Sequence, residues 1–574
     1  MEPVDDAFAA IDPIGLVIGT EDAFALSFWV YVKEGGYLQL DDVVTVPVPL
    51  PDGQAVRLHG IVDTVRSRFE GARFDSDAFA ASEERLPVGI AHAAHVTVTR
   101  FEPEIFIAPP PGAPVYKSEA AQRNEALYFD QMLADRTAFR AGLARDRQPI
   151  YGNLEFLDGT RGAHMNISGI SGVATKTSYA LFLLYSLLRS DALGDHAANT
   201  KAIIFNVKGE DLLWLDKPNN RLDDKARADY ETLGLPVGPF PSVGIWAPVQ
   251  KAGDVLLPAS ESRQEGVTPF AWSLSDFCRE RMLRFLFAEA DSESSQLSFV
   301  IRLVEEWLAR PTIVLDPDER GFVSVAGIEV ETARGFSDLV RIIEDNLPAI
   351  AAHAAEGTRQ AFIRRLYDAA ATAGHLVRPL SHEQTTKHTI RVLDADAGKQ
   401  VNVIDIHNLP DRAKRFVVGV VVRRLVEQKE AMGQRPLVFL VLDELNKYAP
   451  REGWSPIKEV ILDIAERGRS LGVILIGAQQ TASEIERRVT ANASFRVAGR
   501  LDSAEAARAE YGFLTDAAKA RASILKPGTM FLHQPEIPVP LLVQFPFPAW
   551  ATRKAEVDRA DEHAGPALRG GLLQ

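Results

Sequence analysis

A lysine and a threonine follow a loop of small residues near position 170. In AHMNISGISGVATKTSYALFLLYSLL, an apolar run leads into the loop, Lys176 and Thr177 follow, and a helical pattern comes next. Small residues let backbone N–H groups surround an anion, and the helix N-terminus adds positive potential. In a phosphate-binding loop the lysine meets the β- and γ-phosphates of a nucleotide, and the hydroxyl binds Mg²⁺. The predicted nucleotide contacts are Gly169, Ser171, Gly172, Val173, Ala174, Thr175, Lys176, Thr177 and Ser178.

The loop departs from the usual GxxxxGK(S/T) pattern of phosphate-binding loops. Thr175 stands directly before the lysine, where the pattern has glycine, and Gly169 lies one residue further away than the first glycine of the pattern. A plain strand–helix turn is therefore an alternative interpretation of this segment alone. We expect the extra residue to bulge the loop without removing the lysine from the phosphates.

Two adjacent carboxylates, Asp443 and Glu444, end the apolar run LVFLVLDE. In a P-loop ATPase the first acid holds Mg²⁺ through water and the second orients the attacking water. Acids also follow strands simply because the chain emerges into solvent, so the pair by itself is ambiguous. Together with the lysine-bearing loop upstream, it predicts a site for ATP and Mg²⁺.

Two weaker signals surround the run GVILIGAQQ. Gln479 ends this predicted strand at the edge where ligands of open α/β sheets gather, so it can sense the γ-phosphate; an ordinary loop glutamine is the alternative. Arg467 and Arg469 lie just upstream, and arginine stabilises charge on a transferring phosphoryl group, often from a neighbouring subunit. The alternative is a solvated helix end, where arginine is favoured by the helix dipole.

Short apolar runs alternate with helical patterns from about Tyr151 onward. Strands that are apolar throughout and separated by helices are typical of a parallel sheet buried on both faces, so the expected fold is an α/β, RecA-like P-loop core. Helical spacing between the second strand and the acidic pair predicts an inserted helical subdomain. The predicted strands are the runs at 202–207, 401–406, 436–444 and 472–480, together with AHMNIS before the loop.

The first hundred residues have the two-residue period of β-strands. Phe24, Leu26, Phe28, Val30 and Val32 alternate with other residues, and Pro51-Asp52-Gly53 predicts a turn between two β-rich runs, so a small barrel or sandwich is expected. The predicted domains are a barrel at 1–105, a linker at 106–150, an ATPase core at 151–210 and 396–549, a helical insertion at 211–395 and a tail at 550–574.

The whole chain is acidic. Its 574 residues include 63 Lys and Arg against 78 Asp and Glu, a net charge of −15. Non-specific nucleic-acid affinity comes from neutralising phosphates, so any DNA contact requires a local basic lining. The single cysteine, Cys278, is compatible with a reducing cytosol, and no apolar run reaches the ~20 residues that span a bilayer. We therefore expect a soluble cytoplasmic protein without membrane attachment.

Taken in order, these motifs resemble the HerA family, in the HerA/FtsK branch of RecA-like motors. PIGLVIGTEDAFALSFWVYV is similar to the start of the family's N-terminal barrel, and NISGISGVATKTS, KAIIFNVKGED, VLDELNKYAP and ERGRSLGVILIGAQQ occupy the places of its motor motifs. The resemblance implies that Lys176 binds phosphates and that Thr177 and Asp443 complete the metal site. It further implies Glu444 as the catalytic acid, Gln479 as the sensor, and Arg469, with Arg467 next, as an arginine supplied to the neighbouring subunit.

The resemblance also implies a ring, with six subunits in the family, that moves along double-stranded DNA. Partners implied by it are a NurA-like nuclease or a defence effector such as a sirtuin-like NADase or a nuclease. A nucleotide-binding hexameric scaffold with little motor activity is the alternative, and a protein-translocating motor is a third. DNA contacts are predicted at positive charges that leave strand ends, with solvated surface charges as the alternative: Lys208, Arg412, Lys414 and Arg415.

Overall fold

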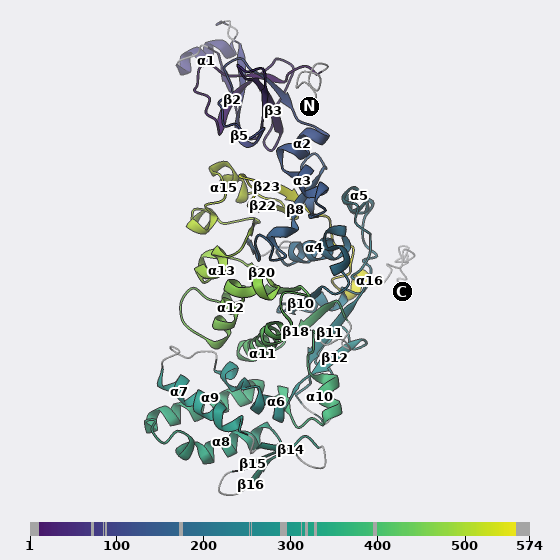
Figure 1. The fold of residues 1–574 in the computed structure, drawn as a ribbon, viewed down its shortest axis with the longest axis vertical. Coiled ribbons are helices and arrows are strands. Elements are labelled where there is room, and N and C mark those ends of the chain that lie inside the picture. The colour runs from purple at the N-terminus through teal and green to yellow at the C-terminus, as the bar shows by residue number, and fades with distance from the viewer. Residues whose placement is uncertain are drawn as a thin grey trace, which may run out of the picture.

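The computed structural model describes residues 11–70, 74–83, 85–86, 89–170, 176–251, 253, 255–287, 295–310, 313–315, 320–326, 330–393 and 399–557. Three parts follow one another along the long axis of the molecule (Figure 1). A β-barrel lies at one end, a large sheet with its helices lies in the middle, and a mainly helical part lies at the other end. The fold is therefore mixed α/β, as the sequence predicts.

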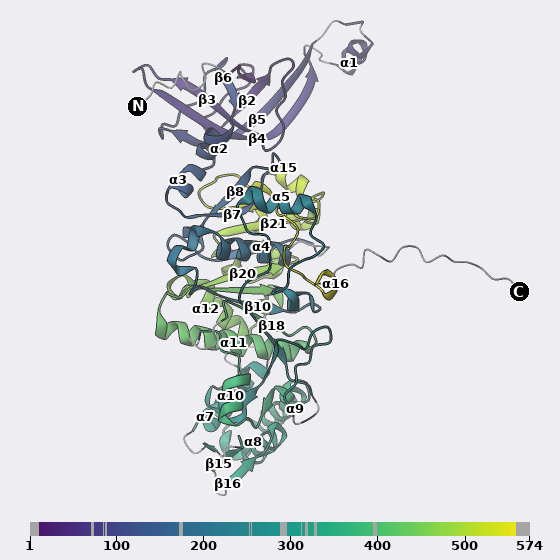
Figure 2. The same cartoon turned by 90° about the vertical axis from the view of Figure 1, so that its right-hand side faces the viewer.

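The barrel is closed and six-stranded. Its strands are β1 (Gly15–Val17), β2 (Ser27–Val32), β3 (Val43–Pro49), β4 (Ala55–Phe69), β5 (Ile90–Glu102) and β6 (Pro114–Lys117), in the spatial order β1-β2-β5-β4-β3-β6. Alternate residues face its core, so that Phe28, Val30 and Val32 of β2 are all buried. The predicted turn joins β3 to β4, and its Gly53 has φ +85°, a conformation that favours glycine. The hairpin of β4 and β5 extends outward to helix α1 (Asp75–Ser82) (Figure 2).

Two predicted boundaries of the barrel are wrong. The strand expected from Phe24 begins only at Ser27, and Phe24 and Leu26 are exposed. The barrel also continues past residue 105, because β6 pairs with both β1 and β3. The predicted linker at 106–150 therefore contains β6, α2 (Ala120–Ala126), α3 (Phe129–Ala134), β7 (Ala138–Leu143) and the start of β8 (Pro149–Asn153).

The central sheet has twelve strands. In spatial order they are β12 (Val267–Phe270), β11 (Val243–Pro248), β18 (Val401–Asp405), β10 (Lys201–Asn206), β19 (Val438–Asp443), β20 (Val473–Gln479), β9 (Met165–Ser168), β21 (Phe495–Ala498), β22 (Thr529–His533), β23 (Leu541–Gln544), β7 and β8. The strands from β12 to β21 are parallel. The remaining pairs are antiparallel. The apolar runs predicted as parallel strands are confirmed as β9, β10, β18, β19 and β20.

Helices cover both faces of the parallel strands. Helix α4 (Lys176–Arg189) packs in one apolar cluster with Ile474 and Ile476 of β20. Helices α11 (Asp411–Met432) and α12 (Pro456–Leu471) pack in another cluster with Val473 and Leu475 of the same strand. Every residue of β19 and β20 is buried, which explains why their sequences are almost continuously apolar.

The insertion is less uniformly helical than predicted. Its strands β11 and β12 extend the central sheet beside β18, so the predicted helical range of 211–395 begins too early. The helical part is built from α6 (Leu274–Arg279), α7 (Gln296–Leu308), α8 (Phe336–Ile350), α9 (Glu356–Ala373) and α10 (His382–His388). A three-stranded sheet of β14 (Ile313–Leu315), β15 (Val323–Ala326) and β16 (Val330–Ala333) accompanies these helices.

Ion pairs attach the barrel to the central part. Arg521 of α15 (Asp516–Ala522) donates to both carboxylate oxygens of Asp41, at 2.8 and 2.6 Å. Arg100 of β5 donates to Asp130 of α3 at 2.9 Å. At the other end of the chain, Trp550 is fully buried, so the predicted tail begins inside the fold; residues 558–574 lie outside the described part. Among the described residues, we find no helix with both the length and the apolarity to cross a membrane.

His164 is a packed residue directly before β9. It is 3% exposed, and its Nδ1 accepts a hydrogen bond from the backbone N–H of Leu475 at 3.0 Å. Burial penalises the charged imidazolium and lowers the pKa of His164 from 6.5 to about 4. The neutral ring therefore joins the start of β9 to β20.

This burial makes stability depend on pH. Below pH 6.5 the unfolded chain binds a proton at His164, while the folded chain does not until about pH 4. The contribution of this histidine to stability, roughly 3 kcal/mol, should be lost as the pH is lowered from 6.5 to 4 and should stay constant above pH 6.5. Urea unfolding midpoints at pH 7 and pH 4.5 test this: His164→Asn should show a smaller difference than the wild type. The control His382→Asn, at an exposed site, should show the same difference between the two midpoints as the wild type. An equal difference in all three proteins contradicts the prediction.

Candidate functional site

Several of the predicted site residues meet at the carboxyl edge of the parallel strands. The strands β9, β20 and β19 are neighbours, and they end in Ser168, Gln479 and Asp443. Helix α4 starts at Lys176, eight residues after the end of β9. The acidic pair and the lysine, far apart in the sequence, are thus brought to one place by strand order alone.

Lys176 lies at the first position of α4 and is only 4% exposed. Its Nζ donates to the carbonyl oxygen of Gly169 at 2.8 Å, and the N–H of Gly169 donates to the carbonyl of Gln479 at 3.2 Å. Burial lowers the pKa of Lys176 to about 8, while Asp443 and Glu444 favour its charged form. A buried ammonium group at a helix N-terminus provides positive potential for an anion. The loop residues Ser171, Gly172, Val173, Ala174 and Thr175 lie outside the described part; Ser178 follows in the first turn of α4.

Thr177 and Asp443 are in direct contact. The Thr177 hydroxyl donates to Asp443 Oδ2 at 2.8 Å, although 266 positions separate the two residues. The other oxygen, Oδ1, accepts the backbone N–H of Glu444 at 2.8 Å. A hydroxyl and a carboxylate oxygen are the hard ligands that Mg²⁺ prefers. The side chains are therefore placed as a metal site with a nucleotide would require.

Glu444 points into the same cluster, with φ +55° at the sharp exit from β19. Its Oε1 lies 3.1 Å from Lys208 Nζ and its Oε2 lies 2.9 Å from Lys447 Nζ. Burial acts to raise the pKa of Glu444, but hydrogen bonds and charge from Lys447 and Lys208 outweigh it and hold the pKa below its usual value. The carboxylate is ionised and able to accept hydrogen bonds.

Gln479 is fully buried at the end of β20. Its side-chain amide donates to Asn166 of β9, while its Oε1 is buried and has no hydrogen-bond partner. An unpartnered buried acceptor costs free energy and often marks a functional group. Asn166 was missed by sequence analysis, because a single asparagine within an apolar run carries no signal of its own.

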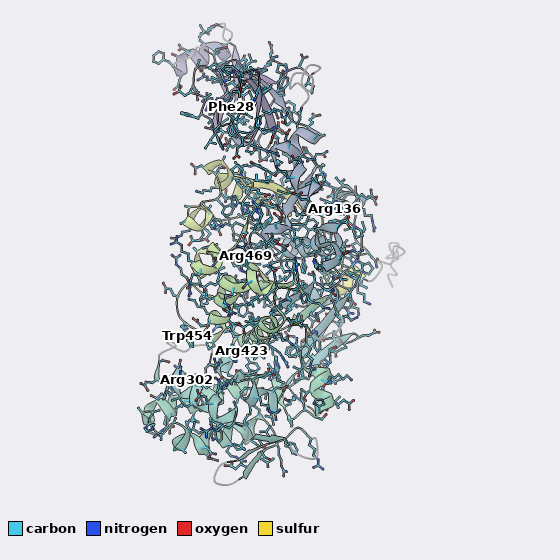
Figure 3. The ribbon with its side chains drawn as sticks, in the orientation of Figure 1. Phe28, Arg136, Arg302, Arg423, Trp454 and Arg469 are labelled. Carbon is cyan, nitrogen blue, oxygen red and sulfur yellow. The ribbon has the colours of Figure 1, made fainter. Side chains whose placement is uncertain are left out.

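The two arginines lie away from the site of their own chain. Arg469 donates to the carbonyl oxygens of Gly159 and Thr160 at 2.9 and 2.6 Å (Figure 3). Arg467 pairs with Asp463 and Glu430. Both are near the end of α12, at the amino edge of β20, so the length of that seven-residue strand, roughly 20 Å, separates them from the carboxyl edge. Within one chain they do not contact the site.

The four predicted DNA contacts are close to the same edge. Lys208 follows β10 and forms ion pairs with Asp443 and Glu444, so it is a paired charge and not a solvated one. Arg412, Lys414 and Arg415 lie in the first turn of α11, which follows β18, and Lys414 donates to the carbonyl of Val207 at 3.4 Å. Lys414 thus contacts the residue that precedes Lys208, and it connects the start of α11 to the end of β10. Trp214 and Trp246 serve in packing: Trp214 is buried, and Trp246 Nε1 donates to Asn402.

Two further features were not found from the sequence. Glu210, Asp405 and His407 have side-chain ligand atoms close enough to hold a cation, but Asp405 already bonds Asn206 and His407, and Glu210 bonds the backbone of Glu261 and Ser262. A cleft of about 930 Å³ separates α7 from α11 and α12, and Arg302, Arg423 and Trp454 line it (Figure 3). None of the predicted site residues lines this cleft.

Comparison with known proteins gives only distant structural matches. No protein-family model and no curated protein matches the chain. It is similar to the bacterial conjugative coupling protein TrwB, at 12% identity and TM-score 0.41, over 71% of this chain and 89% of that one. The chain is also similar to VirB4 of Thermoanaerobacter pseudethanolicus, at 16% identity and TM-score 0.41, over 73% of this chain and 98% of that one. It is similar to the genome packaging NTPase B204 from Sulfolobus turreted icosahedral virus 2, in complex with ATP-gammaS, at 12% identity and TM-score 0.20, over 26% of this chain and 69% of that one. Functional conclusions therefore rest on this chain's own geometry.

The contact between Thr177 and Asp443 predicts a metal-dependent defect. Thr177→Val keeps the side-chain shape but removes the hydroxyl, so nucleotide binding should lose its dependence on Mg²⁺, weakening about tenfold or more in the presence of the metal. Titration with a fluorescent ATP analogue, with Mg²⁺ and with EDTA, measures this. Thr232→Val, at an exposed position of α5 (Asp224–Leu233), is the matched control; an equal effect of both variants would contradict the assigned role of Thr177.

Proposed function

We propose that this protein is an ATPase of the P-loop class. The observation that carries the proposal is the convergence of Lys176, Thr177, Asp443 and Glu444 at one edge of a parallel sheet, with the Thr177–Asp443 hydrogen bond at its centre. Each of these residues supplies a group that phosphoryl transfer to water requires: an ammonium for the phosphates, two oxygen ligands for a metal and a carboxylate for the water.

The residues present fit Mg²⁺. Thr177 and Asp443 would hold the ion, since both offer oxygen atoms within hydrogen-bond distance of each other. When bound, Mg²⁺ would neutralise charge that develops on the β- and γ-phosphate oxygens. The protein's own contribution is then positioning and electrostatics rather than covalent chemistry.

Three side chains have separate parts in the proposed reaction. The ammonium of Lys176 leaves the carbonyl of Gly169 for the phosphate oxygens, whose charge keeps it protonated. Glu444 accepts a hydrogen bond from the attacking water and orients it toward the γ-phosphorus. Gln479, at the end of β20, has an unpartnered Oε1 with which it would sense the γ-phosphate. Burial of Lys176, Asp443 and Gln479 strengthens each of these interactions.

We further propose that hydrolysis drives movement along double-stranded DNA inside a ring of subunits, six in the family that the sequence resembles. The basic start of α11 supports this, because Lys414 contacts the end of β10 and Asp411 lies beside Lys447. A change of the bound nucleotide could therefore alter the contacts of this turn. In such a ring Arg469, or Arg467, would act on the site of the neighbouring subunit. A nuclease or other defence effector as partner follows from the sequence resemblance, with a nucleotide-binding scaffold as the alternative.

Separating binding from hydrolysis tests the ATPase proposal. Glu444→Gln should lower ATP turnover at least about 100-fold while nucleotide affinity changes little, because it removes only the group that orients water. Lys176→Ala should lower both. Steady-state phosphate release and equilibrium nucleotide binding measure the two effects. Full activity in Lys176→Ala would refute the proposal, and a wild type that binds nucleotide and forms rings without turnover would support the scaffold instead.

A role in DNA movement predicts that α11 matters only when DNA is present. Arg412→Ala combined with Arg415→Ala should reduce the stimulation of ATP turnover by duplex DNA and reduce the salt dependence of DNA binding by about two in log–log slope. Turnover without DNA should stay near the wild-type rate. Arg341→Ala with Arg364→Ala, two exposed arginines of the helical part, is the control pair. Unchanged stimulation by DNA in the α11 variant would exclude this turn from the DNA contact.

A further inference from the structure

Both oxygens of the Glu444 carboxylate are occupied by lysines. Lys208 comes from the loop after β10 and Lys447 from the turn after β19, so two separate segments hold one side chain. The glutamate side chain is 18% exposed, whereas the two lysines are 45% and 39% exposed. The lysines can therefore move into solvent at low cost, while the glutamate stays in place.

A carboxylate held in this way is less free to orient water. Each oxygen of Glu444 has two acceptor sites, and a lysine ammonium group already occupies one of them and fixes the direction of the carboxylate. The conformation described by the structure is therefore a resting one with respect to Glu444.

Lys208 also faces the predicted metal ligands. Its Nζ lies 3.7 Å from Asp443 Oδ2, the same oxygen that accepts the Thr177 hydroxyl. An ammonium at that distance repels a divalent cation approaching Asp443, so the cation and Lys208 compete for one pair of carboxylates. Lys208 precedes Gly209, which has φ +58° and open space where a Cβ would be. The backbone next to Lys208 therefore has room to change conformation and move the lysine side chain.

Lys447 connects Glu444 to the start of α11. Its Nζ lies 2.9 Å from Glu444 and 3.9 Å from Asp411, the first residue of that helix. The same turn carries Arg412 and Arg415. A polyanion bound at this turn would attract the Lys447 ammonium group as well, and so draw it away from Glu444.

We propose that Lys208 and Lys447 are positioning residues that hold Glu444 in a resting state, from which a metal–nucleotide releases Lys208 and an anionic ligand at the start of α11 releases Lys447. The proposal rests on the ATPase function proposed above. It assigns to Lys208 a place in the nucleotide site instead of a contact with DNA. It also gives a physical route by which binding at α11 changes the reactivity of Glu444.

The first test measures metal binding without nucleotide. Mn²⁺ titration followed by electron paramagnetic resonance should give about tenfold tighter binding to Lys208→Met than to the wild type, because a repelling charge is removed beside Asp443 and Glu444. Lys201→Met, at the opposite end of β10, is the matched control and should behave as the wild type does. Equal Mn²⁺ affinity in all three proteins would overturn the role of Lys208. This readout needs no hydrolysis, so it stands or fails independently of the ATPase proposal.

The second test measures turnover without DNA. Lys447→Met frees one oxygen of Glu444, so kcat should rise about threefold or more with KM for ATP unchanged, and added duplex DNA should stimulate turnover less than in the wild type. A higher kcat at unchanged KM, together with weaker stimulation by DNA, is a result that a merely structural role of Lys447 would not produce. A kcat at or below that of the wild type would overturn the role of Lys447. A wild type without turnover, together with the Mn²⁺ result expected for Lys208→Met, would instead place the failure in the ATPase proposal.

Discussion

The central constraint on this molecule is a parallel sheet that is buried on both faces. Parallel strands cannot be joined by tight turns, so each connection must cross a face and return to the same edge. The ends of β9, β19 and β20 therefore lie side by side, and the residues that follow them share one site. The hydrogen bond between Thr177 and Asp443 is the direct product of this arrangement, since it joins the start of α4 to the end of β19.

The chain as a whole is acidic, but positive side chains gather in the site. The protein carries a net charge of −15, yet three lysines gather around Asp443 and Glu444. Lys208 balances the carboxylates that a metal ion would otherwise balance, and Lys447 adds a second positive charge beside Glu444. The resting site is thus close to internal neutrality, and a ligand acts by exchanging partners among groups already charged, which costs less than creating new charges in a buried environment.

Continuous apolar runs made the central strands predictable. The strands and strand boundaries that the sequence did not predict correctly have equally specific causes. VGIWAP and VTPF form β11 and β12, but glycine, proline and tryptophan interrupt the pattern that marks a buried strand. PVYK closes the barrel as β6, although the prolines around it favour an irregular linker. Phe24 and Leu26 continue the alternation of β2 but lie outside the strand and are exposed, since periodicity alone does not show where a barrel ends.

The sequence by itself determined which residues could do chemistry and that they would share one edge, because strand type and helix position follow from local apolar patterns. It also indicated that DNA contact would need a local basic surface. Only the tertiary structure decided how those groups are paired. Lys208, expected on a DNA-facing surface, lies beside Asp443 and Glu444. Lys447 and Asn166 lie within quoted motifs, but the sequence assigned them no role in the site. Side-chain pairing depends on distances of a few ångströms between segments far apart in the chain, and no local pattern encodes such distances.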